Sequence, residues 1–163
     1  MIELKEASCS FSDGFGGKGL FTAVSPLSAH FSDGGRYAIV GESGSGKTTL
    51  ARMIAGLQRP SGGSVFVDGE PIYGRKRAGK EHFRKVQIIQ QNSASALDPK
   101  IPVGKSIEEP LLCFFHMEKE KRRERCRNLM ELCNLSRDYY TRLPSELSGG
   151  CLLYTSDAAD DTP

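Results

Sequence analysis

The chain has 163 residues, a formal net charge of +2 and no tryptophan. This length suits one ordinary domain, with room at most for a small subdomain beside it. With 38% hydrophobic and 26% charged residues, the chain can form a core, which excludes a disordered coil. It lacks a run of about 18 apolar residues and the apolar stretch of a signal peptide, so we expect a cytoplasmic chain without a transmembrane helix. The small net charge gives no reason to expect a nucleic-acid partner.

The apolar pattern predicts five strands and the segments that connect them. In chain order, the strands are expected at residues 2–11 (edge type), 23–31, 37–40 (buried parallel type), 64–67 and 86–89 (buried type). The connecting segments are a glycine-rich loop at 13–19 and turns at 33–35 and 68–69.

Two helices are predicted where apolar residues repeat at i, i+3, i+4 and i+7. The first repeat is Leu50, Met53, Ile54 and Leu57, and the second is Cys126, Leu129, Met130 and Cys133. Between them, the basic stretch 75–85 indicates a solvated helix or loop, with a basic anion-binding patch as the alternative.

Cysteine usage gives no sign of a disulfide framework or of a zinc site. The five residues are Cys9, Cys113, Cys126, Cys133 and Cys151. Their number is odd and no pair has CxxC spacing, so we expect small core residues in a reducing compartment.

The clearest chemical motif is the phosphate-binding pattern G-x-x-x-x-G-K-[ST] at residues 41–48, between an apolar run and an amphipathic helix. Its backbone N–H groups would surround an anion at a helix N-terminus. Lys47 would reach the β- and γ-phosphates, and Thr48 would offer its hydroxyl to Mg²⁺. The alternatives are a chance glycine-rich turn and a dinucleotide site, and the second leaves Lys47 unexplained because G-x-G-x-x-G is not satisfied.

A second motif, Leu147-Ser148-Gly149-Gly150, also has the composition of a phosphate-binding helix start. Ser148 is a good N-cap residue and the glycines expose backbone N–H groups. Taken alone, the motif is more typical of an ordinary Ser-Gly-Gly turn.

Together, the phosphate loop, Gln91 and the 147–150 motif resemble the nucleotide-binding domain of ATP-binding cassette (ABC) transporters over residues 1–150. The resemblance implies that Gln91 is the Q-loop residue, which contacts Mg²⁺ and senses the transmembrane partner, and that 147–150 is the signature motif. It also implies that Phe11 stacks on adenine, with a core phenylalanine as the alternative.

In this family the signature motif binds the γ-phosphate of ATP held by the other subunit, so the resemblance implies a head-to-tail dimer with a like or related ATPase. It assigns ATP to Phe11, Gly41, Glu42, Ser43, Gly44, Ser45, Gly46, Lys47, Thr48 and Thr49, and in trans to Ser148, Gly149 and Gly150. It assigns Mg²⁺ to Thr48 and Gln91, and catalytic roles to Lys47 and Gln91.

Finer features are similar to the peptide and nickel importers of this family. They are the stretches at 95–99, at 107–111 and at 144–147. Because the ATPase subunit does not contact the cargo, they do not separate peptide from nickel.

After the signature the sequence departs from the family. Cys151 stands where the family has glutamine, and residues 151–163 contain no lysine or arginine. This tail resembles the translated read-through of a transposase-type sequencing adapter, and we expect it to be non-native. The Walker B aspartate, the catalytic glutamate and the switch histidine of the family have no counterpart.

These features predict an α/β fold: a P-loop NTPase (ABC ATPase) core with a β subdomain plus a partial, truncated helical subdomain. The core is expected at residues 1–91, the helical subdomain at 92–150 and the non-native tail at 151–163. The expected parent function is ATP-driven import through permease subunits, at the cytoplasmic face of the inner or plasma membrane. The alternatives are a soluble non-transport ABC-type ATPase and a non-functional truncated fragment. The truncated chain itself is expected to bind nucleotide at most and not to hydrolyse it.

Overall fold

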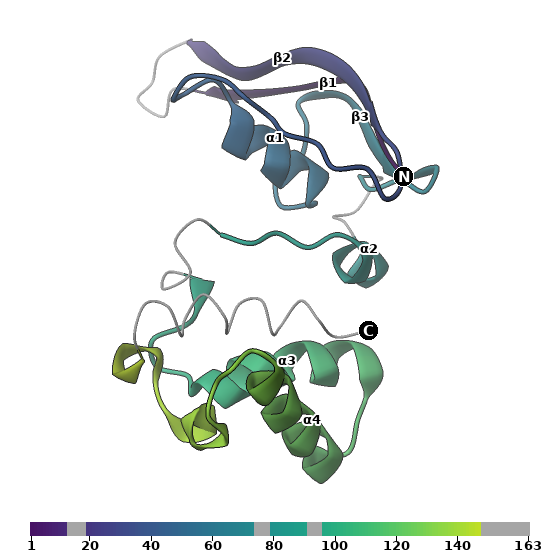
Figure 1. The fold of residues 1–163 in the computed structure, drawn as a ribbon. Helices are drawn as coiled ribbons and strands as arrows, with labels where there is room; N and C mark the ends of the chain where they lie inside the picture. The colour runs from purple at the N-terminus through teal and green to yellow at the C-terminus, as the bar shows by residue number, and fades with distance from the viewer. Residues whose placement is uncertain (13–18, 74–78, 91–95, 148–163) are drawn as a thin grey trace. The chain divides into compact units, whose positions relative to one another are not determined.

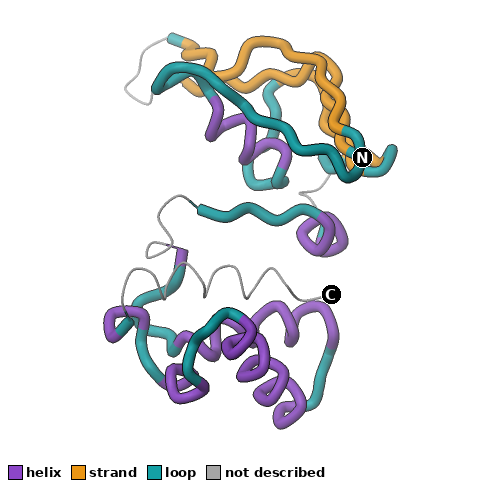
Figure 2. The backbone as a smooth tube through the Cα atoms, in the orientation of Figure 1, coloured by secondary structure: helices purple, strands orange, loops and turns teal. Residues whose placement is uncertain are grey.

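The computed structural model describes residues 1–12, 19–73, 79–90 and 96–147. The chain divides into two compact units, Met1–Ile88 and Ile89–Pro163. Figure 2 shows that the strands of the described chain all lie in the first unit, whereas the second is helical.

The first unit is built on a four-stranded antiparallel sheet in the order β2-β1-β3-β4 (Figure 1). Its strands are β1 (Ile2–Ser12), β2 (Leu20–Phe31), β3 (Gly62–Val67) and β4 (Glu70–Pro71). The strands predicted at 2–11, 23–31 and 64–67 are therefore confirmed.

The prediction that the first strand is an edge strand was wrong, because β1 pairs with β2 on one side and with β3 on the other. Register shifts lie between Leu4 and Ala7 and again between Ala7 and Cys9. These irregularities interrupt the alternation of buried and exposed residues along β1. The sequence pattern therefore does not show that the strand lies inside the sheet.

The predicted turn at 68–69 closes the β3–β4 hairpin. Asp68 and Gly69 both have positive φ, +53° and +80°, which is the backbone of a type I′ turn and matches the twist of the flanking strands.

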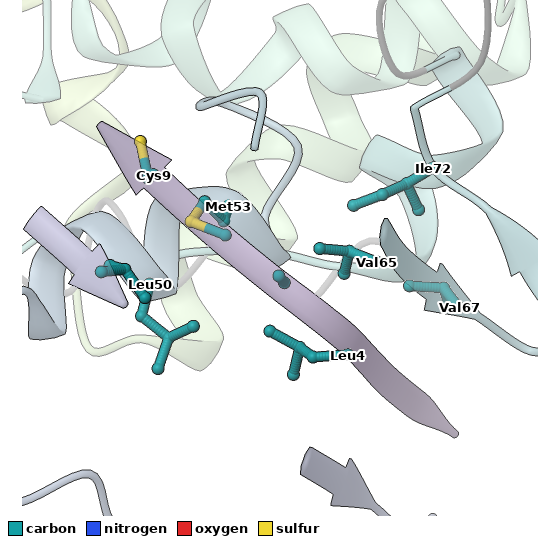
Figure 3. Close-up of a cluster of buried hydrophobic side chains, with 9 residues drawn as sticks. Leu4, Cys9, Leu50, Met53, Val65, Val67 and Ile72 are labelled. Atoms are coloured by element: carbon teal, nitrogen blue, oxygen red, sulfur yellow. The ribbon is translucent and has the colours of Figure 1, made fainter. Parts of the chain in front are cut away.

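The core of the first unit lies between the sheet and α1 (Lys47–Ile54). Leu50 and Met53 of α1 pack among sheet residues that include Leu4, Cys9 and Val65 (Figure 3). The predicted helix stripe is confirmed at these two positions. It was wrong at Leu57, which is 53% exposed, because the helix ends at Ile54 and Gly56 follows with a φ of +77°.

The two strands predicted at 37–40 and 86–89 do not form. Both segments run without strand pairing in the described chain, and Val40 is 90% exposed. An apolar run becomes a parallel strand only when neighbouring strands take up its backbone hydrogen bonds. Among the described residues, the sheet contains the four strands β1, β2, β3 and β4 and neither of these two segments.

The basic stretch ends in the short helix α2 (Lys80–Lys85). Most of its charged side chains are exposed, namely those of Lys80, Glu81, Arg84 and Lys85, whereas His82 is buried. The prediction of a solvated element is therefore confirmed for this part of the stretch. Residues 74–78 lie outside the described residues.

The second unit packs α3 (Val103–Phe115) against α4 (Lys119–Leu132) and the 3₁₀ turn η2 (Arg137–Thr141), and η3 (Pro144–Glu146) follows. Cys126, Leu129 and Met130 of the predicted stripe are buried in its core, and Cys133 packs against it. Among the cysteines, Cys9 and Cys126 are buried as expected, whereas Cys113 is exposed and contradicts the prediction.

A buried carboxylate joins the elements of the second unit. Glu108 of α3 is only 4% exposed. The Tyr140 hydroxyl of η2 donates to it at 2.5 Å, the Lys105 ammonium donates at 2.9 Å, and Arg122 of α4 lies 3.5 Å away.

This arrangement makes the stability of the second unit depend on pH. Burial alone raises the pKa of Glu108, but the hydrogen bonds from Tyr140 and Lys105 outweigh it and hold the pKa below its ordinary value of 4.5. As the pH falls, the Glu108 carboxylate is therefore protonated in the unfolded chain before it is protonated in the folded one. The stabilisation is present above the unfolded pKa and is lost as the pH falls through the folded one.

We expect the difference in unfolding free energy between wild type and Glu108→Gln to shrink as the pH is lowered below about 4.5. Urea unfolding followed by circular dichroism at a series of pH values measures it. A difference that stays constant across the acid range contradicts the assignment.

Candidate functional site

The phosphate-loop motif forms a tight turn that leads directly into α1. The backbone N–H of Ser45 donates to the Glu42 carbonyl at 3.2 Å, and the helix begins at Lys47. The turn passes through the left-handed region at Gly44 (φ +83°) and at Gly46 (φ +88°), where L-residues are strained.

The two glycines serve different purposes. A Cβ on Gly46 would lie 2.1 Å from the carbonyl oxygen of Ala23, so the loop rests directly on the backbone of β2. A Cβ on Gly44 would meet nothing within 4 Å, so the backbone at Gly44 is open to a ligand.

Lys47 folds back over the loop. Its ammonium donates to the carbonyl oxygens of Gly41 at 2.9 Å and Glu42 at 2.6 Å, and to the Ser45 hydroxyl at 3.4 Å. These bonds place a positive charge at the mouth of the loop.

The first turn of α1 suits an anion. The N-cap Gly46 provides no side-chain cap, and the turn contains no acidic residue. The leading N–H groups of a helix have no intrahelical partner and carry partial positive charge. Together with Lys47 and the exposed Thr48, they fit a nucleotide phosphate with its Mg²⁺: N–H groups and an ammonium for the phosphate, a hydroxyl oxygen for the metal.

A cavity of about 570 Å³ opens beside the loop. The loop lines one side of it and β2 lines the other, with Phe21 among the β2 residues. Phe11 lies at the end of β1 and is 41% exposed, so the alternative of a core phenylalanine was wrong. Phe21 lies opposite Phe11 in the β1–β2 pairing, a position that no local pattern in the sequence predicts.

Comparison with known proteins identifies the family. The family described as "ABC transporter" matches residues 24–152. The chain belongs to the ABC transporter family.

The curated relatives of this ABC protein include the oligopeptide transport ATP-binding protein OppF of Streptococcus pyogenes serotype M1. That relative is 38% identical over 153 residues, which are 92% of this chain and 49% of the relative. The dipeptide transport protein DppF of Escherichia coli is 36% identical (80% of this chain, 40% of the relative), and the nickel import protein NikE of Brucella suis is 37% identical (80% and 50%). The chain thus spans about half the length of the curated relatives it matches.

The solved structures show the fold of the ABC chain. A dimeric ATP-binding cassette, MJ0796, in a post-hydrolysis state with ADP and Pi, matches with a TM-score of 0.82 at 23% identity, over 99% of this chain and 69% of that one. The predicted α/β fold class, an ABC ATPase core, is confirmed. No helix in the described part of the chain is long and apolar enough to span a bilayer.

The remaining predicted site residues of the ABC domain stay predictions. Gln91 and the signature residues Ser148, Gly149 and Gly150 lie outside the described residues, as does the tail at 151–163. The structure brings together the phosphate loop, Lys47 and the start of α1.

Proposed function

We propose that the protein is the ATP-binding subunit of an ABC importer for peptides or nickel, coupling ATP binding and hydrolysis to transport. The observation that carries the proposal is the phosphate loop. The Lys47 ammonium, the open backbone at Gly44 and the uncapped start of α1 all belong to this one short loop. The transport relatives OppF, DppF and NikE support the importer class.

In this proposal the loop residues 41–49 bind ATP. Lys47 neutralises the β- and γ-phosphates, and the N–H groups at the start of α1 hold their oxygens. Mg²⁺, with Thr48 and Gln91 as its protein ligands, supplies charge neutralisation of the phosphates. Ser148, Gly149 and Gly150 act on the nucleotide of a second ATPase subunit, which is identical or related.

The proposal further assigns residues 1–91 to the nucleotide-binding core and 92–150 to the helical subdomain. Permease subunits are the membrane partners. The ATPase then lies at the cytoplasmic face of the membrane as a peripheral subunit. Co-purification with a permease distinguishes this assignment from a soluble ABC-type ATPase.

The nucleotide site is tested by Lys47→Ala. A charge-assisted hydrogen bond contributes about 1.5–3 kcal/mol, so we expect ATP affinity to fall by roughly tenfold or more. Isothermal titration calorimetry of the full chain with Mg²⁺-ATP measures the affinity. Lys80→Ala, which removes an exposed lysine from α2, is the matched control and should leave it unchanged. Equal affinity in wild type and Lys47→Ala contradicts the proposed site.

A further inference from the structure

The segment between β2 and the phosphate loop has an unpaired backbone. Residues 36–40 form neither helix nor strand in the described chain, and Figure 2 shows them as loop between β2 and α1. Within the described residues, no backbone–backbone hydrogen bond involves these five positions. Backbone N–H and C=O groups need hydrogen-bond partners, so the segment offers a row of free donors and acceptors.

The side chains of this segment are apolar and exposed. Val40 is 90% exposed, Tyr37 is 53% exposed and Ile39 is 43% exposed. The run 37–40 contains no charged residue, no proline and no glycine, and it includes aromatic and β-branched residues. A short uncharged run with high strand propensity and a free backbone edge is a template for strand pairing with another chain.

Open space lies beside the segment. Tyr37 and Ile39 line a second cavity of about 570 Å³. Ile39 also lines the cavity beside the phosphate loop, as does Val40. These apolar side chains are therefore available to a binding partner. The lining of the second cavity further includes Phe31, Ile54 and Val67, with the charged residues Asp33, Asp68 and Lys85.

The charges that flank the apolar run select the orientation of a partner copy. Arg36 precedes the run and Glu42 follows it, both side chains are exposed, and neither has an ion pair within the described residues. If two copies pair antiparallel about a two-fold axis at Ile39, Arg36 of each copy lies opposite Glu42 of the other. A parallel, in-register pair puts like charges beside each other, which destabilises a strand pair.

We propose that the chain pairs with a second copy of itself through residues 36–42, as an antiparallel, two-fold symmetric strand pair centred on Ile39. The carbonyls of Gly41 and Glu42 already accept hydrogen bonds within the loop, so the backbone bonds between the copies come from residues 38–40. A contact through one short segment is small beside a stable interface of roughly 1,200–2,000 Å². We therefore expect a weak dimer whose population depends on protein concentration.

Val40→Lys tests the contact. Lysine on an exposed strand edge blocks pairing between chains, and the side chain of Val40 contributes little to the fold of a single copy because it is exposed. Sedimentation velocity of the full chain without nucleotide, over a series of protein concentrations, measures the dissociation constant of the dimer. We expect a dimer in wild type and a dissociation constant that rises roughly tenfold or more in Val40→Lys.

Leu132→Lys is the matched control. It makes the same kind of change at an apolar residue that is 77% exposed at the end of α4, far from the segment in sequence. It should leave the dissociation constant of the dimer unchanged.

Charge reversal tests the orientation. Arg36→Glu alone, or Glu42→Arg alone, places like charges opposite each other at both ends of the strand pair. Each should raise the dissociation constant by about tenfold, and the double variant should restore the wild-type value. Circular dichroism confirms that each variant remains folded, and these variants at exposed positions give a second reading if Val40→Lys does not fold.

Several results would overturn the proposal. One is a chain that stays monomeric at every concentration; if hydrogen exchange then finds the amides of residues 37–40 protected, residues of the same chain cover the segment. Another is an association that Val40→Lys leaves intact, or one that continues beyond a dimer into open-ended aggregates. Failure of the double variant to restore the dimer excludes the antiparallel pairing. Because no nucleotide is present in these experiments, loss of ATP binding counts against the proposed function alone.

Discussion

Replacing Glu108 with alanine should destabilise the helical unit by about 3 kcal/mol. The substitution leaves the Tyr140 hydroxyl and the Arg122 guanidinium in a buried site without the carboxylate that they contact. Removal of one partner of a buried charged network costs more than the bonds themselves, because the remaining groups stay desolvated. Hydrogen exchange of the α3 and α4 amides measures the effect within this unit.

The neighbouring Glu109 provides the control. It is the same residue type, one position along the same helix, and it is exposed. Glu109→Ala should change stability by less than about 0.5 kcal/mol. If the α3 and α4 amides lose the same protection against hydrogen exchange in both variants, the buried network is not what stabilises the unit.

Replacing Gly46 with alanine should lower the free energy of unfolding by roughly 3 kcal/mol. It should also abolish measurable ATP binding. Part of the cost, about 1–2 kcal/mol, is the strain of an L-residue at a φ of +88°. The rest comes from the Cβ, which would lie 2.1 Å from a backbone carbonyl of β2 and would force the loop away from the sheet. Urea unfolding gives the stability, and calorimetry gives the ATP affinity.

Gly44→Ala separates the two contributions. Gly44 has nearly the same φ, +83°, but open space where the Cβ would be. The Gly44→Ala variant should therefore lose only the part of the unfolding free energy that comes from backbone strain, about 1–2 kcal/mol. Equal losses of stability in the two variants would mean that the contact with β2 contributes nothing.

The features that could be predicted from sequence are those that depend on local spacing. The phosphate loop has fixed residues at fixed intervals, so residues 41–48 and the helix after them were located correctly. The stripe of Cys126, Leu129 and Met130 likewise follows from the helical repeat alone.

The features that could not be predicted depend on partners distant in sequence. The apolar run ending at Val40 has the composition of a buried strand, but whether it becomes one depends on hydrogen-bonding neighbours. The position of β1 inside the sheet depends on pairing with β3, about 60 residues away. Glu108 and Glu109 are adjacent residues of the same type, and only the packing of η2 on α3 decides which carboxylate is buried.

The contact between Gly46 and Ala23 has a thermodynamic consequence. Because the loop rests on the backbone of β2, the loop geometry that binds an anion requires β2 to be in its native position. A ligand that binds only this geometry stabilises the native pairing of β1 with β2 by mass action, in proportion to the logarithm of its concentration above the dissociation constant. The sheet and the nucleotide are then linked equilibria, and each favours the other even though the ligand need not touch most of the strands that it stabilises.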